Sequence, residues 1–258
     1  MLPRAVPLFL SLSLASCASA NGDAGPDGGR FDARERADAG TGDAAGPLGA
    51  ADAAPGATAD AGDTTPDAGI LTEALLITEI VDADLAGGLP KFVELTNLGS
   101  ASVDLSEFSL GVFSNGSFTI NTGSSTSLSG SLAPSASFVV SFETGDSVGS
   151  SSFRTVYGFD ADDLSFGAVI NGDDAVVLFR GAATGTGADA TIIDIYGVIG
   201  TDGTGEVWEY LDGFASRAAG ATTPSATFVP TAWSFSGASA LDGEDATAIA
   251  AATSPGTH

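Results

Sequence analysis

The feature that most constrains the fold is a series of short runs rich in β-branched and aromatic residues, which begins at about residue 70. Examples are KFVELTNL (91–98), SASFVVSFE (135–143) and DAVVLFR (174–180). Clusters of Gly, Ser, Asn and Asp separate the runs, as in SNGS (114–117) and TDGTG (201–205). Short runs of this kind between turn signals are typical of β-strands. Helical periodicity is nearly missing, so the sequence predicts an all-β fold, an antiparallel sandwich or barrel.

The order of side chains within the runs predicts which of them enter the core. Successive side chains of a strand point to opposite faces of the sheet. We therefore expect Val93 and Leu95 to point inward and Glu94 to point outward. Two further runs carry apolar side chains at every second position: Phe108, Leu110 and Val112, and Phe138, Val140 and Phe142. The Asn-Gly pairs at 115–116 and 171–172 suit turn positions with positive φ.

The segment before residue 70 has a composition that cannot build a core. Residues 17–69 consist mainly of Ala, Gly, Asp, Pro and Thr, with DAG recurring four times and Phe31 as the single aromatic residue. Such a segment buries too little apolar surface to offset its chain entropy. We expect a disordered, acidic tether at 17–69 and one folded domain at 70–258.

The first 16 residues have the organisation of a secretory signal peptide. Arg4 is followed by the apolar stretch 5–14 and then by small residues before Cys17. The stretch is too short to span a bilayer, which takes about 20 residues. LASC (14–17) resembles the lipobox of bacterial lipoproteins, and this resemblance implies lipidation at Cys17. Ala18 after the cysteine implies the outer membrane or cell surface. An ordinary secretory signal with an incidental cysteine is the alternative.

Charge and residue usage exclude several functions. The chain has 33 Asp and Glu against 8 Lys and Arg, a formal charge of −25. This charge repels phosphate backbones, so we expect no nucleic-acid partner. One Cys and one His, the terminal His258, leave no internal disulfide, no thiolate zinc site and no histidine-based catalysis. We therefore expect a protein that is not an enzyme.

Several motifs in order resemble the lamin tail domain. A first strand contains Ile77, Glu79 and Ile80, and a second contains Glu94 and Asn97. A turn and strand follow at 103–110 and a hairpin at 128–140; the turn contains Asp104 and Ser106. INGDDAVVLFRG and IIDIYGVIG are similar to the later half of bacterial members. The resemblance implies an immunoglobulin-like sandwich in which these polar residues belong to the fold motif. Asp104 and Ser106 suit Asx and ST turns.

Acidic loops are candidates for calcium, which binds six to eight oxygen ligands. Asp173 and Asp174 form one candidate group and Asp202 and Glu206 another, and further groups lie at 82–84 and 160–163. None has the spacing of an EF-hand, and ordinary turn chemistry explains the NGDD sequence equally well. Calcium is the only cofactor that the sequence offers.

Three aromatic residues leave a choice between a binding and a structural role. Trp208, Tyr210 and Trp233 suit stacking on sugar rings, but burial in a sandwich core is the commoner fate of such residues. The leading hypothesis is a cell-envelope lipoprotein that displays an interaction, adhesion or structural module toward an envelope protein or polysaccharide. The alternatives are a calcium-dependent carbohydrate or envelope-polymer binder and a hydrolase based on paired carboxylates.

Overall fold

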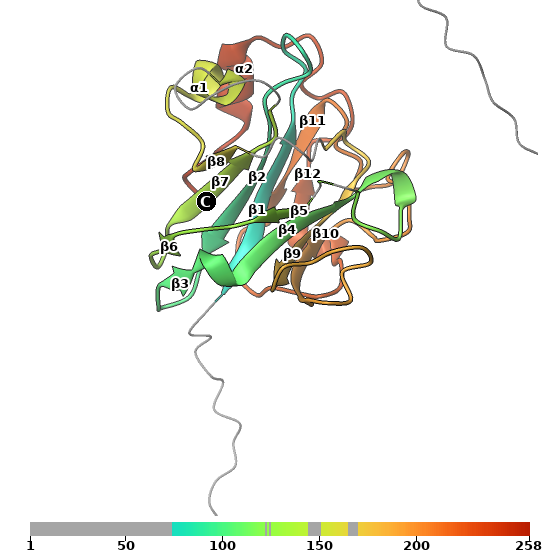
Figure 1. The fold of residues 1–258 in the computed structure, drawn as a ribbon. Coiled ribbons are helices and arrows are strands. Elements are labelled where there is room, and N and C mark those ends of the chain that lie inside the picture. The colour runs from blue at the N-terminus through green and yellow to red at the C-terminus, as the bar shows by residue number, and fades with distance from the viewer. Residues whose placement is uncertain (1–73, 122, 124, 144–150, 165–169) are drawn as a thin grey trace, which may run out of the picture. The chain divides into compact units, whose positions relative to one another are not determined.

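The computed structural model describes residues 74–121, 123, 125–143, 151–164 and 170–258. Two sheets face each other in this part of the chain (Figure 1). The larger sheet contains, in spatial order, β12 (Trp233–Phe235), β11 (Gly213–Arg217), β1 (Leu75–Asp82), β2 (Lys91–Asn97), β7 (Ser137–Ser141) and β8 (Asp163–Leu164). The smaller sheet contains β10 (Thr191–Tyr196), β9 (Ala175–Arg180), β4 (Phe108–Phe113) and β5 (Ser125–Ser127). The predicted all-β sandwich is confirmed.

The remaining elements are short. They comprise a two-stranded pair of β3 (Val103–Asp104) with β6 (Ser131–Leu132), three 3-10 helices η1 (Leu105–Glu107), η2 (Ser114–Gly116) and η3 (Pro230–Ala232), and the helices α1 (Ser152–Tyr157) and α2 (Ala246–Ala252). The strand pairings of the described residues are antiparallel except that between β7 and β8, which is parallel. None of the described helices is long and apolar enough to cross a membrane.

The main core lies between the two sheets and follows the alternation of the sequence. Phe108, Leu110 and Val112 of β4 face Val93 and Leu95 of β2 in one buried cluster. The predicted inward faces of these strands are therefore confirmed. Phe138 and Val140 of β7 join the same cluster, as does Phe142 just after that strand.

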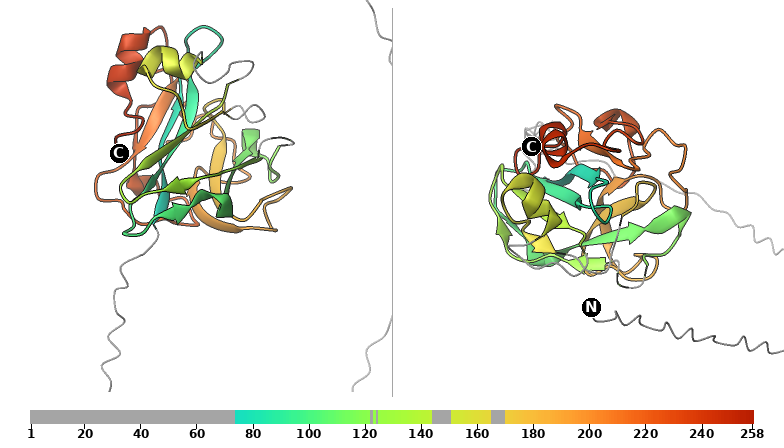
Figure 2. Two further views of the ribbon diagram at one scale, coloured as in Figure 1. Left: turned by 60° about the vertical axis from the view of Figure 1, so that its left-hand side comes forward. Right: turned by 90° about the horizontal axis from the view of Figure 1, so that it is seen from above.

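Both outer faces of the sandwich are covered, which the sequence did not indicate. On the larger sheet, Phe92 and Val139 pack against Phe153 of α1 and Ile249 of α2. The two helices lie side by side over this sheet (Figures 1 and 2). On the smaller sheet, outward side chains including Phe179 form a third apolar cluster beneath loops. Apolar residues on both sides of a strand therefore follow from layers outside the sandwich.

The described part of the segment 145–165 contains α1. Ser151 caps this helix because its side chain accepts a hydrogen bond from the Arg154 amide. Gly158 ends the helix with a φ of 82°. The helix places Phe153 in the apolar cluster of the outer layer.

Candidate functional site

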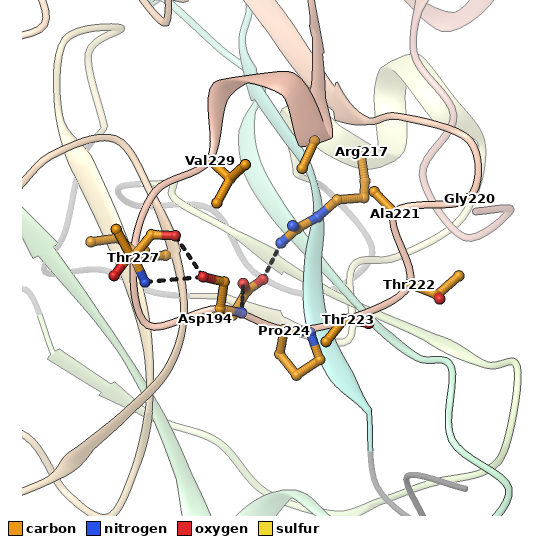
Figure 3. Close-up of a pocket in the computed structure, with 12 residues that line it drawn as sticks. Asp194, Arg217, Gly220, Ala221, Thr222, Thr223, Pro224, Thr227 and Val229 are labelled. Atoms are coloured by element: carbon orange, nitrogen blue, oxygen red, sulfur yellow. Dashed lines mark hydrogen bonds and ion pairs between the residues drawn. The ribbon is translucent and has the colours of Figure 1, made fainter. Parts of the chain in front are cut away.

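A buried ion pair between Asp194 of β10 and Arg217 of β11 joins the two sheets (Figure 3). The Nη2 atom of Arg217 donates to Oδ2 of Asp194, and its Nε atom donates to the Ile77 carbonyl at 3.1 Å. The Ile77 amide donates to the same carboxylate at 2.9 Å. Three strands, β1, β10 and β11, are thus tied together at one point.

Both side chains of this pair are buried. The side chains of Asp194 and Arg217 are 1% and 3% exposed. The guanidinium lies over the ring of Trp233, 4.4 Å from its centroid. Burial raises the pKa of Asp194, against the opposing effect of the Arg217 charge and of the bonds from the Ser225 and Ile77 amides. Burial likewise lowers the pKa of Arg217, and the Asp194 charge opposes that change.

A cavity of about 380 Å³ lies in front of the ion pair. Its wall is the loop that runs from Gly220 to Val229, and Ile195 and Ala232 complete it (Figure 3). The loop is anchored because the Ser225 amide donates to Oδ1 of Asp194 at 2.9 Å. A volume of this size falls within the range of about 300–1,000 Å³ that is typical of small-molecule sites.

A second cavity of about 240 Å³ adjoins the first, with Ile195 and Thr227 lining both. Its other walls are largely apolar and include Ile192, Val198 and Phe228. The two cavities together follow β10 on the side where the smaller sheet ends.

Glu79 and Glu94 oppose each other across β1 and β2 on the outer face of the larger sheet. A β-bulge at Thr78 shifts the register between Ile77 and Glu79, which turns Glu79 toward this face. Glu94 points outward, as expected, but both carboxyl groups are buried. The segment after α2 covers them.

Both carboxyl groups hold the end of the chain. The Ser254 amide donates to both oxygens of Glu79 at 3.0 and 3.1 Å, and the Gly256 amide donates to Glu94. Burial raises the pKa of Glu79 to about 8, and the nearby charge of Glu94 adds to the effect. Burial also raises the pKa of Glu94, whereas the hydrogen bond from Thr78 opposes it. These residues serve the fold rather than an open site.

The other residues of the expected fold motif make local bonds. Asn97 is buried, and its Nδ2 atom donates to the Ala101 and Leu132 carbonyls at 2.8 and 3.0 Å. Asp104 accepts from the Ser106 amide at 3.0 Å and caps η1. All three therefore shape the turns that lead into and out of β3 and β6.

The four acidic residues considered for calcium do not form a metal-binding group in the described part of the chain. Asp174 is buried and accepts from the Asn115 amide at 3.0 Å. Asp173 and Asp202 lie near each other, and both contact Thr204. Glu206 is exposed. Among the described residues, no three Asp, Glu, His or Cys side chains form a group that could hold a metal ion.

The aromatic residues belong to the core. Tyr196 is the centre of a cluster in which the rings of Trp208, Tyr210 and Trp233 lie 6.1, 5.4 and 4.7 Å from its own. The Tyr196 hydroxyl donates to the Trp208 carbonyl at 2.6 Å. Trp208, Tyr210 and Trp233 are at most 6% exposed, so the structural role applies and no platform for sugar stacking exists at these residues. Cys17, the expected lipidation site, lies outside the described residues.

Comparison with protein families assigns the domain. The sequence model of the lamin tail domain matches residues 71–199, half of the 258-residue chain. The chain belongs to the lamin tail domain family. Comparison with curated proteins and with solved structures gave no match. Lamin tail domains are non-catalytic immunoglobulin-like domains, and this one is accordingly an interaction or structural module.

The match to the lamin tail domain ends before the candidate pocket is complete. Asp194 and Ile195 lie inside the matched residues, whereas Arg217 and the loop 220–229 lie beyond them. β11 also lies beyond the match, although it pairs with the central strand β1. The pocket thus combines the lamin tail domain with residues outside the family match.

Proposed function

We propose that this protein is an exported lipoprotein, anchored through Cys17, that displays its lamin tail domain as an interaction module at the cell envelope. The observation that carries the proposal is the N-terminal sequence MLPRAVPLFLSLSLASC, in which a basic residue, a short apolar stretch and a lipobox occur in order. The matched domain beyond residue 70 supports the second half of the proposal. We infer the outer membrane as the destination from Ala18.

The composition of residues 17–69 predicts a tether that would give the domain reach. A random coil of roughly 50 residues has a root-mean-square end-to-end distance of about 40 Å, and repulsion among aspartates would lengthen it. Two or three acyl chains would hold the protein far more firmly than one chain does, since each buried methylene contributes about 0.8 kcal/mol.

The sheet edges favour binding at pockets and loops over binding by strand addition. In the described residues, three of the four edge strands of the two main sheets, β5, β8 and β12, have two or three residues each. Short edges offer few free backbone groups to a second chain. The fourth edge, β10, has the loop with Ser225 bonded to its Asp194 side chain.

Metabolic labelling tests the anchor. Cells that express the full chain are grown with an alkyne-labelled fatty acid and separated into envelope and soluble fractions. We expect label and envelope association for the wild type and neither for Cys17→Ser, whereas Ser16→Ala should leave both unchanged. Equal envelope association of an unlabelled Cys17→Ser protein would refute the anchor.

Affinity capture tests the module. The full chain, solubilised in detergent, serves as bait for envelope components with calcium and then with chelator. A partner retained under both conditions supports the proposed interaction module. Retention with calcium alone would instead favour the calcium-dependent alternative, and the absence of any partner would favour a purely structural role.

A further inference from the structure

The pocket in front of Arg217 offers hydrogen-bond donors that the fold leaves unused. Arg217 uses Nε for the Ile77 carbonyl and Nη2 for Asp194, and no described residue accepts from Nη1. Figure 3 shows the guanidinium within the ring of residues that line the cavity. Thr222 and Thr223, whose hydroxyl groups make no described hydrogen bond, lie on the exposed wall of the same cavity.

The charge around the pocket selects against ions. Asp194 neutralises Arg217, and its oxygens are occupied by Arg217 and by the Ile77 and Ser225 amides. The carboxylate therefore has little capacity left for a cation or a ligand donor. The formal charge of −25 repels an anion. The free hydrogen-bond donors of the pocket therefore suit a neutral ligand group that contains a hydrogen-bond acceptor.

The apolar walls of the cavity favour a ligand that also carries an apolar group. Ile195, Pro224, Val229 and Ala232 line the cavity beside the polar floor. A carbonyl oxygen that accepts from Arg217 and a methyl group that packs on these walls are both present in an acetamido group. The adjoining apolar cavity of about 240 Å³ provides room for a neighbouring unit of a polymer.

We propose that this pocket binds the acetamido group of an N-acetylated amino sugar, with the carbonyl oxygen on Arg217 and the methyl group against Ile195 and Val229. The inference rests on the proposed function, since it names a polymer class that an envelope-anchored interaction module would meet. Thr222 and Thr223 then face the sugar hydroxyl groups. Binding requires no calcium, because every contact is made by the chain itself.

Calorimetric titration of the full chain in detergent micelles tests the proposal with three probes. These are tri-N-acetylglucosamine, cellotriose, which has hydroxyl groups in place of the acetamido groups, and the neutral peptide N-acetyl-dialanine amide. We expect saturable binding of the first probe, at least about tenfold weaker binding of the second, and none of the third. Binding in chelator should equal binding in calcium. Equal affinity for cellotriose, equal affinity for the peptide, or no binding of the first probe would overturn the proposal.

A matched pair of variants locates the site without disturbing the ion pair. Ala221→Leu adds bulk to a half-buried side chain on the pocket wall, and Ala238→Leu adds the same bulk to an exposed turn. We expect the first variant alone to weaken binding of tri-N-acetylglucosamine by at least about tenfold. Both variants should keep nearly the unfolding midpoint of the wild type, because neither side chain lies in the core. Equal binding by both variants would refute the location.

Two further readouts separate this proposal from the proposed function. Trp233 lies against Arg217, so its fluorescence should change on binding in a Trp208→Phe background. If affinity capture retains an envelope partner that Ala221→Leu and excess tri-N-acetylglucosamine leave in place, the interaction module stands and the sugar assignment fails. If Cys17→Ser remains in the envelope while tri-N-acetylglucosamine binds normally, the sugar assignment stands and the lipid anchor of the proposed function fails.

Discussion

The buried carboxyl group of Glu79 should make the domain less stable as the pH rises. Its pKa is about 8 in the folded domain, against an ordinary value of 4.5, because burial disfavours the charged form. The folded state therefore keeps a proton that the unfolded chain has already lost. This contribution to stability is fully present below about pH 4.5 and is lost as the pH rises through about 8.

The magnitude follows from the two pKa values. One pKa unit corresponds to about 1.4 kcal/mol, so the difference amounts to about 5 kcal/mol when Glu79 is fully ionised. Between about pH 5 and 8 the free energy of unfolding should fall by about 1.4 kcal/mol per pH unit from this group alone. Asp82 and Asp174, whose pKa burial raises to about 6, act in the same direction at lower pH. The interval above about pH 6.5 therefore reports mainly on Glu79.

Glu79→Gln provides the test. A glutamine side chain stays neutral at every pH, and its carbonyl oxygen still accepts from the Ser254 amide. Urea unfolding followed by tryptophan fluorescence at a series of pH values gives the free energy of unfolding. We expect the wild type and the exposed control Glu244→Gln to lose stability above pH 6.5, and Glu79→Gln to lose much less. Parallel curves for all three proteins would refute the reasoning.

Three further outcomes follow from the contacts. Gly172 has a φ of 93°, and a Cβ atom there would lie 2.1 Å from the Cα atom of Leu211, so Gly172→Ala should lower the unfolding midpoint steeply. Gly243→Ala, with open space around it, should cost only the positive-φ strain of about 1 kcal/mol. Asp194→Asn should destabilise the domain by about 3–5 kcal/mol in urea unfolding, and adding Arg217→Met should restore part of the loss. Tyr196→Phe removes one buried hydrogen bond and should cost about 1 kcal/mol by the same assay without changing the fold seen by circular dichroism.

Much of the sandwich could be predicted because its strands and turns depend on residues that are close together in the sequence. The alternation in β4 and β7 and the Asn-Gly turn at Gly172 each depend on neighbouring residues, and each is found in the structure. The parallel pairing of β8 could not be predicted, since it depends on a two-residue strand brought to β7 by the chain that precedes it.

The candidate pocket was missed for a physical reason. Its ion pair joins residues from separate strands, and its loop carries no chemical motif. One signal was present in the sequence: Asp194 interrupts the apolar run IIDIY, and a charge within such a run usually requires a buried partner. Glu94 points outward as expected, but its burial could not be predicted, because the cover comes from the far end of the chain, where Gly256 donates to it.

The position of β1 has a consequence for how the chain folds. β1 is the first strand of the described residues but lies inside the larger sheet, between β2 and β11. The bond between Ile77 and Arg217 joins residues 140 positions apart, and that between Glu79 and Ser254 joins residues 175 apart. During synthesis, which starts at the N-terminus, one edge of β1 stays unpaired until β11 has been made. Folding therefore depends on contacts between residues far apart in the sequence and comes late. Until β11 pairs with β1, the free edge of β1 is exposed and can associate with other unfolded chains.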